Sequence, residues 1–313
     1  MLNRLRPEWP TLALILLAYA GWVLAGWLLY PVAPMAGVAV MVVSTVLHSS
    51  LVHEACHGHP TRSGLVNEVL MTPNPGLIWP FRRFRKLHLQ HHADDRLTDP
   101  FDDPESFYRA AWWYDGLPRI VRAVLAFSNT LLGRLVLGPP LGAIALLAGD
   151  LRQFNRQIAL AWTLHVIGLV PVLWCVTELF EMSLWLYLLV VVWPSAAVIS
   201  LRTFAEHRWH ETPDGRTIIV ERSPLAFLFL NNNLHLVHHS HPSVAWYRLP
   251  TLYRAKADVW RARNQGYVFR CYWPLLRAYF LKAKEPVSHP VWHRQQASLD
   301  KARSSNRHRV PAE

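Results

Sequence analysis

The chain contains few cysteines and none of them lie close together. Cys56, Cys175 and Cys271 are the three cysteines among 313 residues, an odd number at wide spacing. This set excludes a disulfide framework, and it excludes zinc or redox sites built on the CxxC spacing. The sequence also has no CxxCH or His-Pro-Gly-Gly motif for haem and no GxGxxG motif for a dinucleotide. No haem-binding or flavin segment of these kinds is therefore fused to the chain.

Positive charge is missing from one long stretch, and charges of both signs are scarce in another. No Lys or Arg lies between Arg6 and Arg62, and a second charge-poor block extends from Gln157 to Leu201. Hydrophobic residues make up 52% of the chain, and 15 residues are Trp. Because a helix of about 20 apolar residues crosses a bilayer, this composition indicates an integral membrane protein.

We predict an all-α membrane protein with four transmembrane helices in two hairpins. The spans are expected at about residues 11–30, 33–52, 157–178 and 182–202. Turns at 31–34 and 177–182 separate the members of each hairpin. The first segment is too long for the core of a signal peptide and another span follows it directly, so we expect it to be retained.

The formal charge of +11 is distributed unevenly. Residues 254–313 hold 13 Lys and Arg against 4 Asp and Glu. Beside apolar spans, such a basic segment marks the cytoplasmic side and anionic headgroups, and we expect no nucleic-acid partner. Both predicted turns lack Lys and Arg, so the positive-inside rule places both termini, and an active site at the ends of the spans, in the cytoplasm.

Two further apolar stretches carry basic residues. Residues 119–151 include three arginines and the Pro139-Pro140 pair, which we expect to divide the stretch into interfacial helices below spanning length. Residues 267–282 mix aromatic and basic side chains, and we expect them to pack on the membrane surface.

The domain prediction follows from these segments. Residues 1–287 are expected to form a single membrane domain with a cytoplasmic cap at 53–156 and 203–287. Residues 288–313 are polar, and we expect a disordered tail.

Histidines occur in clusters with a repeated spacing. His235, His238 and His239 stand at i, i+3 and i+4 among apolar neighbours, and a helix brings all three to one face. The same spacing recurs upstream, a pair at i and i+4 ends the second span, and a further histidine follows the fourth. The nine candidate ligands are His53, His57, His88, His91, His92, His207, His235, His238 and His239. Imidazole is a common metal ligand and one zinc uses about four ligands, so nine are enough for two metals.

The first pair permits another interpretation. His53, Glu54 and His57 satisfy the HExxH pattern of zinc peptidases, in which two helical histidines hold zinc and the glutamate serves as general base. A protease has no use for two additional HxxHH clusters, whereas a dinuclear site uses all three. A non-catalytic metal-binding or transport protein is a further alternative; transport would need ionisable residues within the spans, and only His48 and His165 are candidates there.

The clusters have the forms HxxxH, HxxHH and HxxHH, and the first two lie between the predicted hairpins. This arrangement resembles the membrane fatty acid desaturase superfamily, whose relatives include carotenoid ketolases and hydroxylases. The resemblance extends from about Thr11 to Tyr253. One departure concerns Thr203, because some acyl-CoA desaturases have Asn four residues before the histidine that corresponds to His207.

The resemblance implies a di-iron oxidoreductase with two Fe ions held by the nine histidines and with O2 as co-substrate. The implied substrate is a membrane lipid or acyl chain that is desaturated; the alternative is hydroxylation or ketolation of an acyl lipid or carotenoid. A separate electron donor of the ferredoxin or cytochrome type is then required. The basic surface around Arg82, Arg83, Arg85 and Lys86 could dock an acidic donor or bind headgroups.

Acidic residues near the clusters could hydrogen-bond the distal ring nitrogens. The candidates are Glu54, Glu206, Asp94 and Asp95. The acidic run from Thr98 to Glu105 also resembles the superfamily at this place. Packing or surface roles are expected for the remaining internal histidines, His48, His59, His165, His210 and His241.

Overall fold

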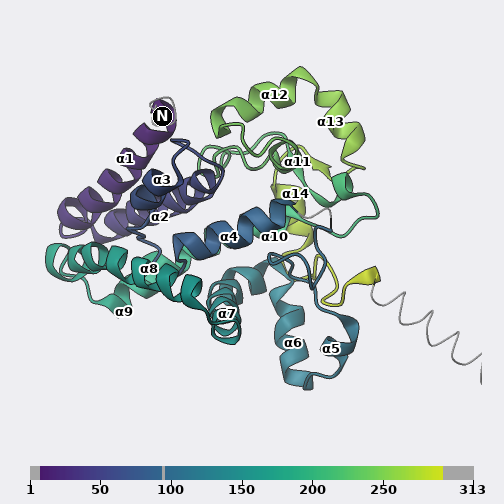
Figure 1. Ribbon diagram of the computed structural model, residues 1–313, viewed down its shortest axis with the longest axis horizontal. Coiled ribbons are helices and arrows are strands. Elements are labelled where there is room, and N and C mark those ends of the chain that lie inside the picture. The colour runs from purple at the N-terminus through teal and green to yellow at the C-terminus, as the bar shows by residue number, and fades with distance from the viewer. Residues whose placement is uncertain (1–7, 94–95, 292–313) are drawn as a thin grey trace, which may run out of the picture.

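A computed structural model describes residues 8–93 and 96–291 of the chain (Figure 1). These residues are mostly helical. The long helices α1, α2 and α8 and the short α9 gather on one side of the molecule, and α5, α6, α12 and α13 lie on the opposite side. The described strands, β1 (Ile219–Val220) and β2 (Val268–Phe269), form a short parallel pair.

The first predicted hairpin is present. α1 (Trp9–Leu24) continues as the π-helical segment η2 (Ala25–Leu29), and α2 (Pro34–Cys56) returns after a short turn. Pro34 begins α2, where its fixed φ suits the first helical position and its missing N–H costs no helical bond. Because α2 runs four residues beyond its expected end, His53 lies within the helix.

The second predicted hairpin is also present. α8 (Arg156–Trp174) continues as η3 (Cys175–Leu179), and the returning helical arm consists of α9 (Leu184–Tyr187), η4 (Leu188–Val192) and α10 (Trp193–Glu206). The side chains of Asn155 and Ser183 accept backbone N–H bonds at the starts of α8 and α9. His207 directly follows α10.

The expectation that the proline pair divides residues 119–151 into short pieces is wrong. α6 (Arg119–Ser128) is separate, but α7 (Leu131–Arg152) runs without interruption through Pro139 and Pro140. Two adjacent prolines remove two consecutive helical hydrogen bonds, and packing of α7 along α10 compensates, with Gly138 beside Ser200. The structure thus has five helices that are long and apolar enough to span a membrane, among the described residues.

Short elements form the remainder of the described chain. They are α3 (Gly64–Met71), α4 (Phe81–Ala93), α5 (Ala111–Asp115), η5 (Pro213–Arg216), α11 (His235–Ser240), η6 (Trp246–Arg248), α12 (Leu249–Ala255), α13 (Ala257–Arg263) and α14 (Trp273–Ala278). α4 and α11 hold six of the nine candidate histidines.

The two hairpins pack through an apolar core. Trp22, Met41, Phe180 and Tyr187 are buried within it. A Cβ on Gly26 would lie 2.5 Å from the Phe180 ring, so this close approach requires glycine. On the outer faces, large apolar side chains such as those of α8 are exposed, as expected for helices in contact with lipid.

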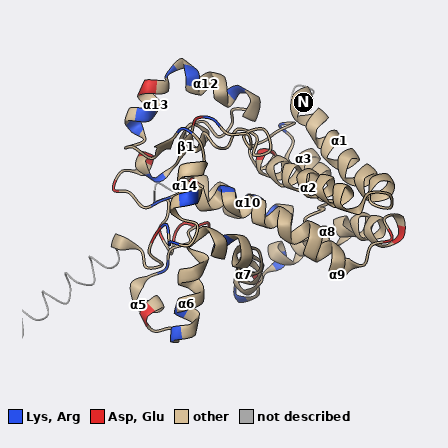
Figure 2. Cartoon of the chain, turned by 180° about the vertical axis from the view of Figure 1, so that it is seen from behind, with Lys and Arg blue, Asp and Glu red and all other residues tan. Residues whose placement is uncertain are grey.

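Charge is segregated in the molecule. α1, α2 and α8 are almost free of charged side chains, whereas Lys and Arg gather around α12, α13 and α14 (Figure 2). Residues 267–282 contribute Tyr267, Tyr272 and Leu275 to a buried cluster and expose Trp273 and Leu281, so this stretch is only partly a surface element. Within the disordered tail predicted at 288–313, Ser288 and His289 are instead buried, and residues 292–313 lie outside the described residues.

Candidate metal centre

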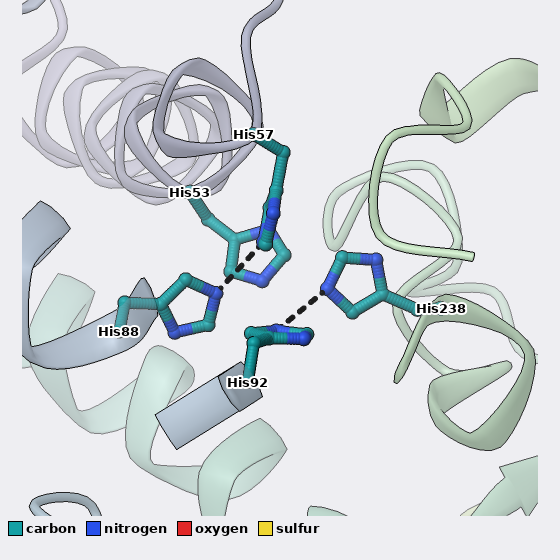
Figure 3. A group of neighbouring side chains, drawn as sticks. All are labelled: His53, His57, His88, His92 and His238. Atoms are coloured by element: carbon teal, nitrogen blue, oxygen red, sulfur yellow. Dashed lines mark hydrogen bonds between the residues drawn. The ribbon is translucent and has the colours of Figure 1, made fainter. Parts of the chain in front are cut away.

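Five histidines from three helices meet at the end of α2 (Figure 3). His53 lies in the last turn of α2 and His57 caps it, His88 and His92 are one turn apart on α4, and His238 comes from α11. One nitrogen from each lies within 4.8 Å of all the others. We call these five residues the first group.

The remaining four candidates form the second group. His207 follows α10, His91 comes from α4, and His235 and His239 lie one turn apart on α11. One nitrogen from each again lies within 4.8 Å of the others. The structure therefore brings together all nine histidines that the sequence singled out. The groups are adjacent, since the rings of His92 and His239 stack with centroids 4.1 Å apart.

The spacing of the ring nitrogens fits metal coordination. The Nε2 atoms of His57 and His88 are 2.9 Å apart, and those of His92 and His238 are 3.2 Å apart. In the second group, Nε2 of His235 lies 2.9 Å from that of His207 and 3.1 Å from that of His239. Two nitrogens bound at about 2.1 Å to one metal, at right angles, lie about 3.0 Å apart.

Unpaired nitrogens support the same interpretation. Nε2 of His53 and Nε2 of His91 are buried and have no hydrogen-bond partner among the described residues. A buried polar atom without a partner costs about 1–3 kcal/mol, and metal ligation would remove that cost. The donor set is rich in nitrogen and suits iron, copper, nickel or zinc better than calcium or magnesium.

Carboxylates hold two of the α4 histidines by their distal nitrogens. Nδ1 of His88 lies 2.7 Å from Glu105 Oε1, and Nδ1 of His91 lies 2.8 Å from Asp103 Oδ1. Each carboxylate is placed to accept the Nδ1–H, and the contact directs Nε2 of the ring into its group. Asp103 also accepts from the backbone N–H groups of Thr98 and Glu105, so the loop that carries both carboxylates is fixed.

Glu206 acts on His235 through an intermediate residue. Asn232 donates to Glu206 Oε1 at 2.8 Å, and its Oδ1 lies 3.1 Å from Nδ1 of His235. Oε1 of Glu206 lies 3.6 Å from Nδ1 of His235 and 3.1 Å from Nε of Arg202, with which Glu206 forms an ion pair. The expected carboxylate is thus near its histidine, but an amide makes the contact.

Glu54 does not make the expected hydrogen bond. Its Oε1 lies 3.7 Å from Nδ1 of His53, and its Oε2 accepts from the backbone N–H of Trp246 at 3.2 Å. Neighbours in a helix point in different directions, so a carboxylate next to a ligand need not reach it. Asp94 and Asp95 lie outside the described residues.

The electrostatic environment favours neutral imidazoles. Burial, assisted by neighbouring His88, lowers the pKa of His57 to about 3. Burial and neighbouring histidines likewise lower the pKa values of His235, His238 and His239. Their neutral form is the form that binds metal.

His91 and Glu105 behave in the opposite way. Burial favours neutral His91, but the carboxylates of Glu105 and Asp103 outweigh it and raise its pKa to about 9. Burial also favours a protonated Glu105, but His91 and His88 outweigh it and hold its pKa below the usual range. Glu105 is therefore ionised at neutral pH.

Glu105, Asp103 and Asn232 were not among the predicted site residues. The acidic run after the second cluster was a signal for Asp103 and Glu105, although the sequence did not tell which of its carboxylates face the histidines. Asn232 stands three residues before His235, a spacing at which two side chains can meet. Thr203 bonds back to the carbonyl of Ser200 within its own helix.

The other internal histidines have separate partners. His48 bonds to Tyr19, His59 to Glu8, His165 to the carbonyl of Leu77 and His210 to Thr212, and His241 packs against Trp260. These contacts agree with the expected packing or surface roles.

The predicted basic surface is partly neutralised. Arg82 pairs with Glu68, and Arg83 pairs with Asp150 of α7 in a buried contact. Arg85 and Lys86 are the exposed part of this surface. A partner that docks here would thus meet fewer free charges than the sequence suggested.

The comparisons with known proteins agree with the site. A protein-family model described as fatty acid desaturase matches residues 25–270. This range includes all nine histidines of the two groups. The search of curated proteins gave no match.

Proposed function

Because the chain belongs to the fatty acid desaturase family, we propose that it is an oxygen-dependent di-iron enzyme that introduces a double bond into a long acyl chain. The observation that carries this proposal is the pair of adjacent histidine groups. One group offers five nitrogens and the other four, and each group could hold one metal ion. Two irons with O2 supply an oxidant strong enough to remove hydrogen from an unactivated methylene.

The chain's own residues hold the proposed irons and set the ligand tautomers. Glu105 and Asp103 keep the distal protons of His88 and His91, and Asn232 lies beside the distal nitrogen of His235. Neutral ligands leave the proposed irons with their full positive charge, which the ionised Glu105 partly balances.

The position of the groups fits a lipid substrate. His53 and His57 end α2, and His207 follows α10, so both groups lie where two apolar helices end. An acyl chain can approach such a site from the bilayer with its apolar part among the spans. We propose a membrane lipid or acyl thioester as substrate, and a separate electron donor of the ferredoxin or cytochrome type.

We propose that four of the five apolar helices cross the membrane and that α7 lies on the cap side. The N–H groups of Leu131 and Leu132 at its start donate to the carbonyls of Tyr279 and Phe280. At its other end Asp150 pairs with Arg83 of α4, the helix that carries three site histidines. A spanning helix of this length would separate its ends by about 33 Å across the bilayer. With four spans, both termini and the site share the cytoplasmic face.

The zinc-peptidase alternative receives less support. Its glutamate would have to face a metal-bound water, but Glu54 accepts a backbone N–H from Trp246 instead. His53 and His57 also share their group with three other histidines, which exceeds the four ligands that zinc usually takes.

Lipid and pigment profiling of cells that express the chain tests the proposal. We expect new unsaturated acyl chains, and we expect none with a His239→Ala variant that inserts at the same level. Hydroxylated lipids or oxidised carotenoids in their place would assign the alternative reaction. An unchanged profile, from cells in which the protein carries two irons, would contradict the proposal.

A further inference from the structure

The segment Tyr279–His289, here called the C-terminal strap, lies beyond the range that the family model matches. It follows α14 and runs along two earlier parts of the chain. Its backbone bonds join Leu131 to Tyr279, Lys284 to Asn129, and Arg109 to both Val287 and His289. The strap therefore connects the start of α7 with the loop that follows Glu105.

Lys284 reaches from the strap to the end of α10. Its Nζ donates to the backbone carbonyl of His207 at 2.5 Å and to the hydroxyl of Tyr267 at 3.0 Å. The Tyr267 hydroxyl in turn donates to the carbonyl of Ala205 at 2.5 Å. Carbonyls at a helix C-terminus lack helical partners, and a cation there is also favoured by the helix dipole.

Aromatic rings enclose the ammonium group. The ring centroids of Phe107, Phe204 and Tyr267 lie 5.5–5.7 Å from Nζ. Such cation–π contacts restrict the position of the ammonium group beyond what its two hydrogen bonds fix. Lys284 is thus a fixed donor rather than a flexible surface lysine.

A second contact fixes the chain on the other side of His207. Tyr108, which is fully buried, donates to Glu285 Oε2 at 2.7 Å and accepts from the backbone N–H of Trp209 at 2.8 Å. The strap therefore holds the backbone at His207 directly through Lys284, and two residues later through Glu285 and Tyr108.

The ring of His207 lacks the kind of side-chain partner that orients three of the other ligands. Distal nitrogens of His88, His91 and His235 have Glu105, Asp103 and Asn232 beside them. Within the described part of the chain, no carboxylate or amide side chain binds the distal nitrogen of His207. The direction of its ring thus depends on its backbone, which the strap holds together with the bonds from Ile218 to Glu206 and from Arg208 to Arg216.

We propose that Lys284 is a positioning residue for His207 and thereby for metal binding at the second group. This inference rests on the proposed function, because it takes both groups as metal sites. Lys284 does not touch the reacting atoms; it orients a ligand through the ligand's main chain. Among the described residues, no hydrogen bond, ion pair or ring contact joins the strap to a histidine of the first group, so this group should be insensitive to changes at Lys284.

The test compares Lys284→Met with Lys282→Met, which removes an exposed lysine two residues away. Full-length protein in detergent is titrated anaerobically with Fe(II) against a chelator of known affinity. Two backgrounds separate the groups: His57→Ala/His88→Ala disables the first and His235→Ala/His239→Ala disables the second. We expect Lys284→Met to weaken iron binding about 10-fold or more in the first background and to leave it unchanged in the second. Lys282→Met should have no effect in either.

The sign of the effect distinguishes positioning from simple electrostatics. Removing the positive charge of Lys284 would relieve its Coulomb repulsion of the metal ion and strengthen metal binding, whereas loss of positioning weakens metal binding. Tighter iron binding, unchanged binding, or equal weakening in both backgrounds would each overturn the inference. If Lys284→Met fails to fold, Tyr267→Phe is the second variant. It keeps the ring and removes the hydroxyl that Lys284 binds, and it should weaken iron binding at the second group.

Failure of the proposed function gives a different result. If the protein without these substitutions binds no iron at either group, the di-iron proposal fails before any strap variant is compared. If it binds two irons and the second group ignores both Lys284→Met and Tyr267→Phe, only the role of the strap is refuted.

Discussion

Substitution of Glu105 should weaken metal binding at the first group. Its carboxylate accepts the Nδ1–H of His88 at 2.7 Å and is held in its ionised form by His91 and His88, which belong to the second and the first group. Glu105→Gln keeps the size of the side chain and a neutral acceptor, but it removes the charge. Charge-assisted hydrogen bonds are about twice as strong as neutral ones, so we expect a loss of about 1.4 kcal/mol, or 10-fold in affinity. Glu105→Ala also frees the ring to rotate, and about 100-fold is expected.

Anaerobic Fe(II) titration in each disabled-group background measures these effects. The matched control is Glu178→Gln, which changes an exposed glutamate in η3, at the turn of the second hairpin. Equal affinities for Glu105→Ala, Glu178→Gln and the unmodified chain would refute the argument that Glu105 sets the tautomer of His88. A larger effect at the second group would show that the 4.0 Å approach of Glu105 to His91 matters more than the contact with His88.

Three further predictions concern stability. Arg83→Met leaves the buried Asp150 with its hydrogen bond from Trp162 but without its cationic partner, so we expect a loss of about 3–5 kcal/mol in the free energy of unfolding. Chemical denaturation should show a loss of less than about 1 kcal/mol for Arg82→Met, which breaks a more exposed pair. Gly168→Leu should lower the melting temperature, because a Cβ at this position in α8 would lie 2.3 Å from Thr72 Cγ2. The control Gly149→Ala should leave the melting temperature nearly unchanged, because a Cβ at that position would meet no atom within 4 Å. Burial lowers the pKa of His289 to about 4, against the attraction of Asp99, so protonation favours the unfolded state. Its contribution to stability is present above the ordinary histidine pKa of about 6.5 and is lost as pH falls toward 4; hydrogen exchange of the strap should increase over this window and less so in His289→Gln, and equal pH dependence in both proteins would contradict this.

Metal chemistry explains why sequence reasoning found the histidines. Ligands on one helix must be three or four residues apart to reach one ion, so spacing alone marked His53 with His57 and the two HxxHH clusters. The assignment of each histidine to a group was not predictable, because His91 and His92 are adjacent in sequence and point to different groups.

The hydrogen-bond partners of the ligands were less accessible to sequence reasoning. Glu54 and Glu206 are next to His53 and His207 in sequence, yet neither hydrogen-bonds the distal nitrogen of that histidine, because successive side chains of a helix diverge. Asp103 and Glu105 reach α4 from a loop, and loop geometry depends on tertiary contacts such as the bond from Thr98 to Asp103.

Both hairpins were predictable from the length and composition of their apolar runs. The continuity of α7 was not, because a proline pair normally ends a helix and packing along α10 overrides that preference here. The strap gave no sequence signal either, since its contacts with His207 and Asn129 join residues more than 70 positions apart.

Iron content per chain tests the central claim most directly. Purified full-length protein, reconstituted anaerobically with Fe(II) and freed of excess metal, should hold about two irons. The His57→Ala/His88→Ala and His235→Ala/His239→Ala variants should each hold about one, and the combination of all four substitutions none. A single metal in the unmodified protein, or two metals retained after either pair of substitutions, would contradict two adjacent histidine-bound metal sites.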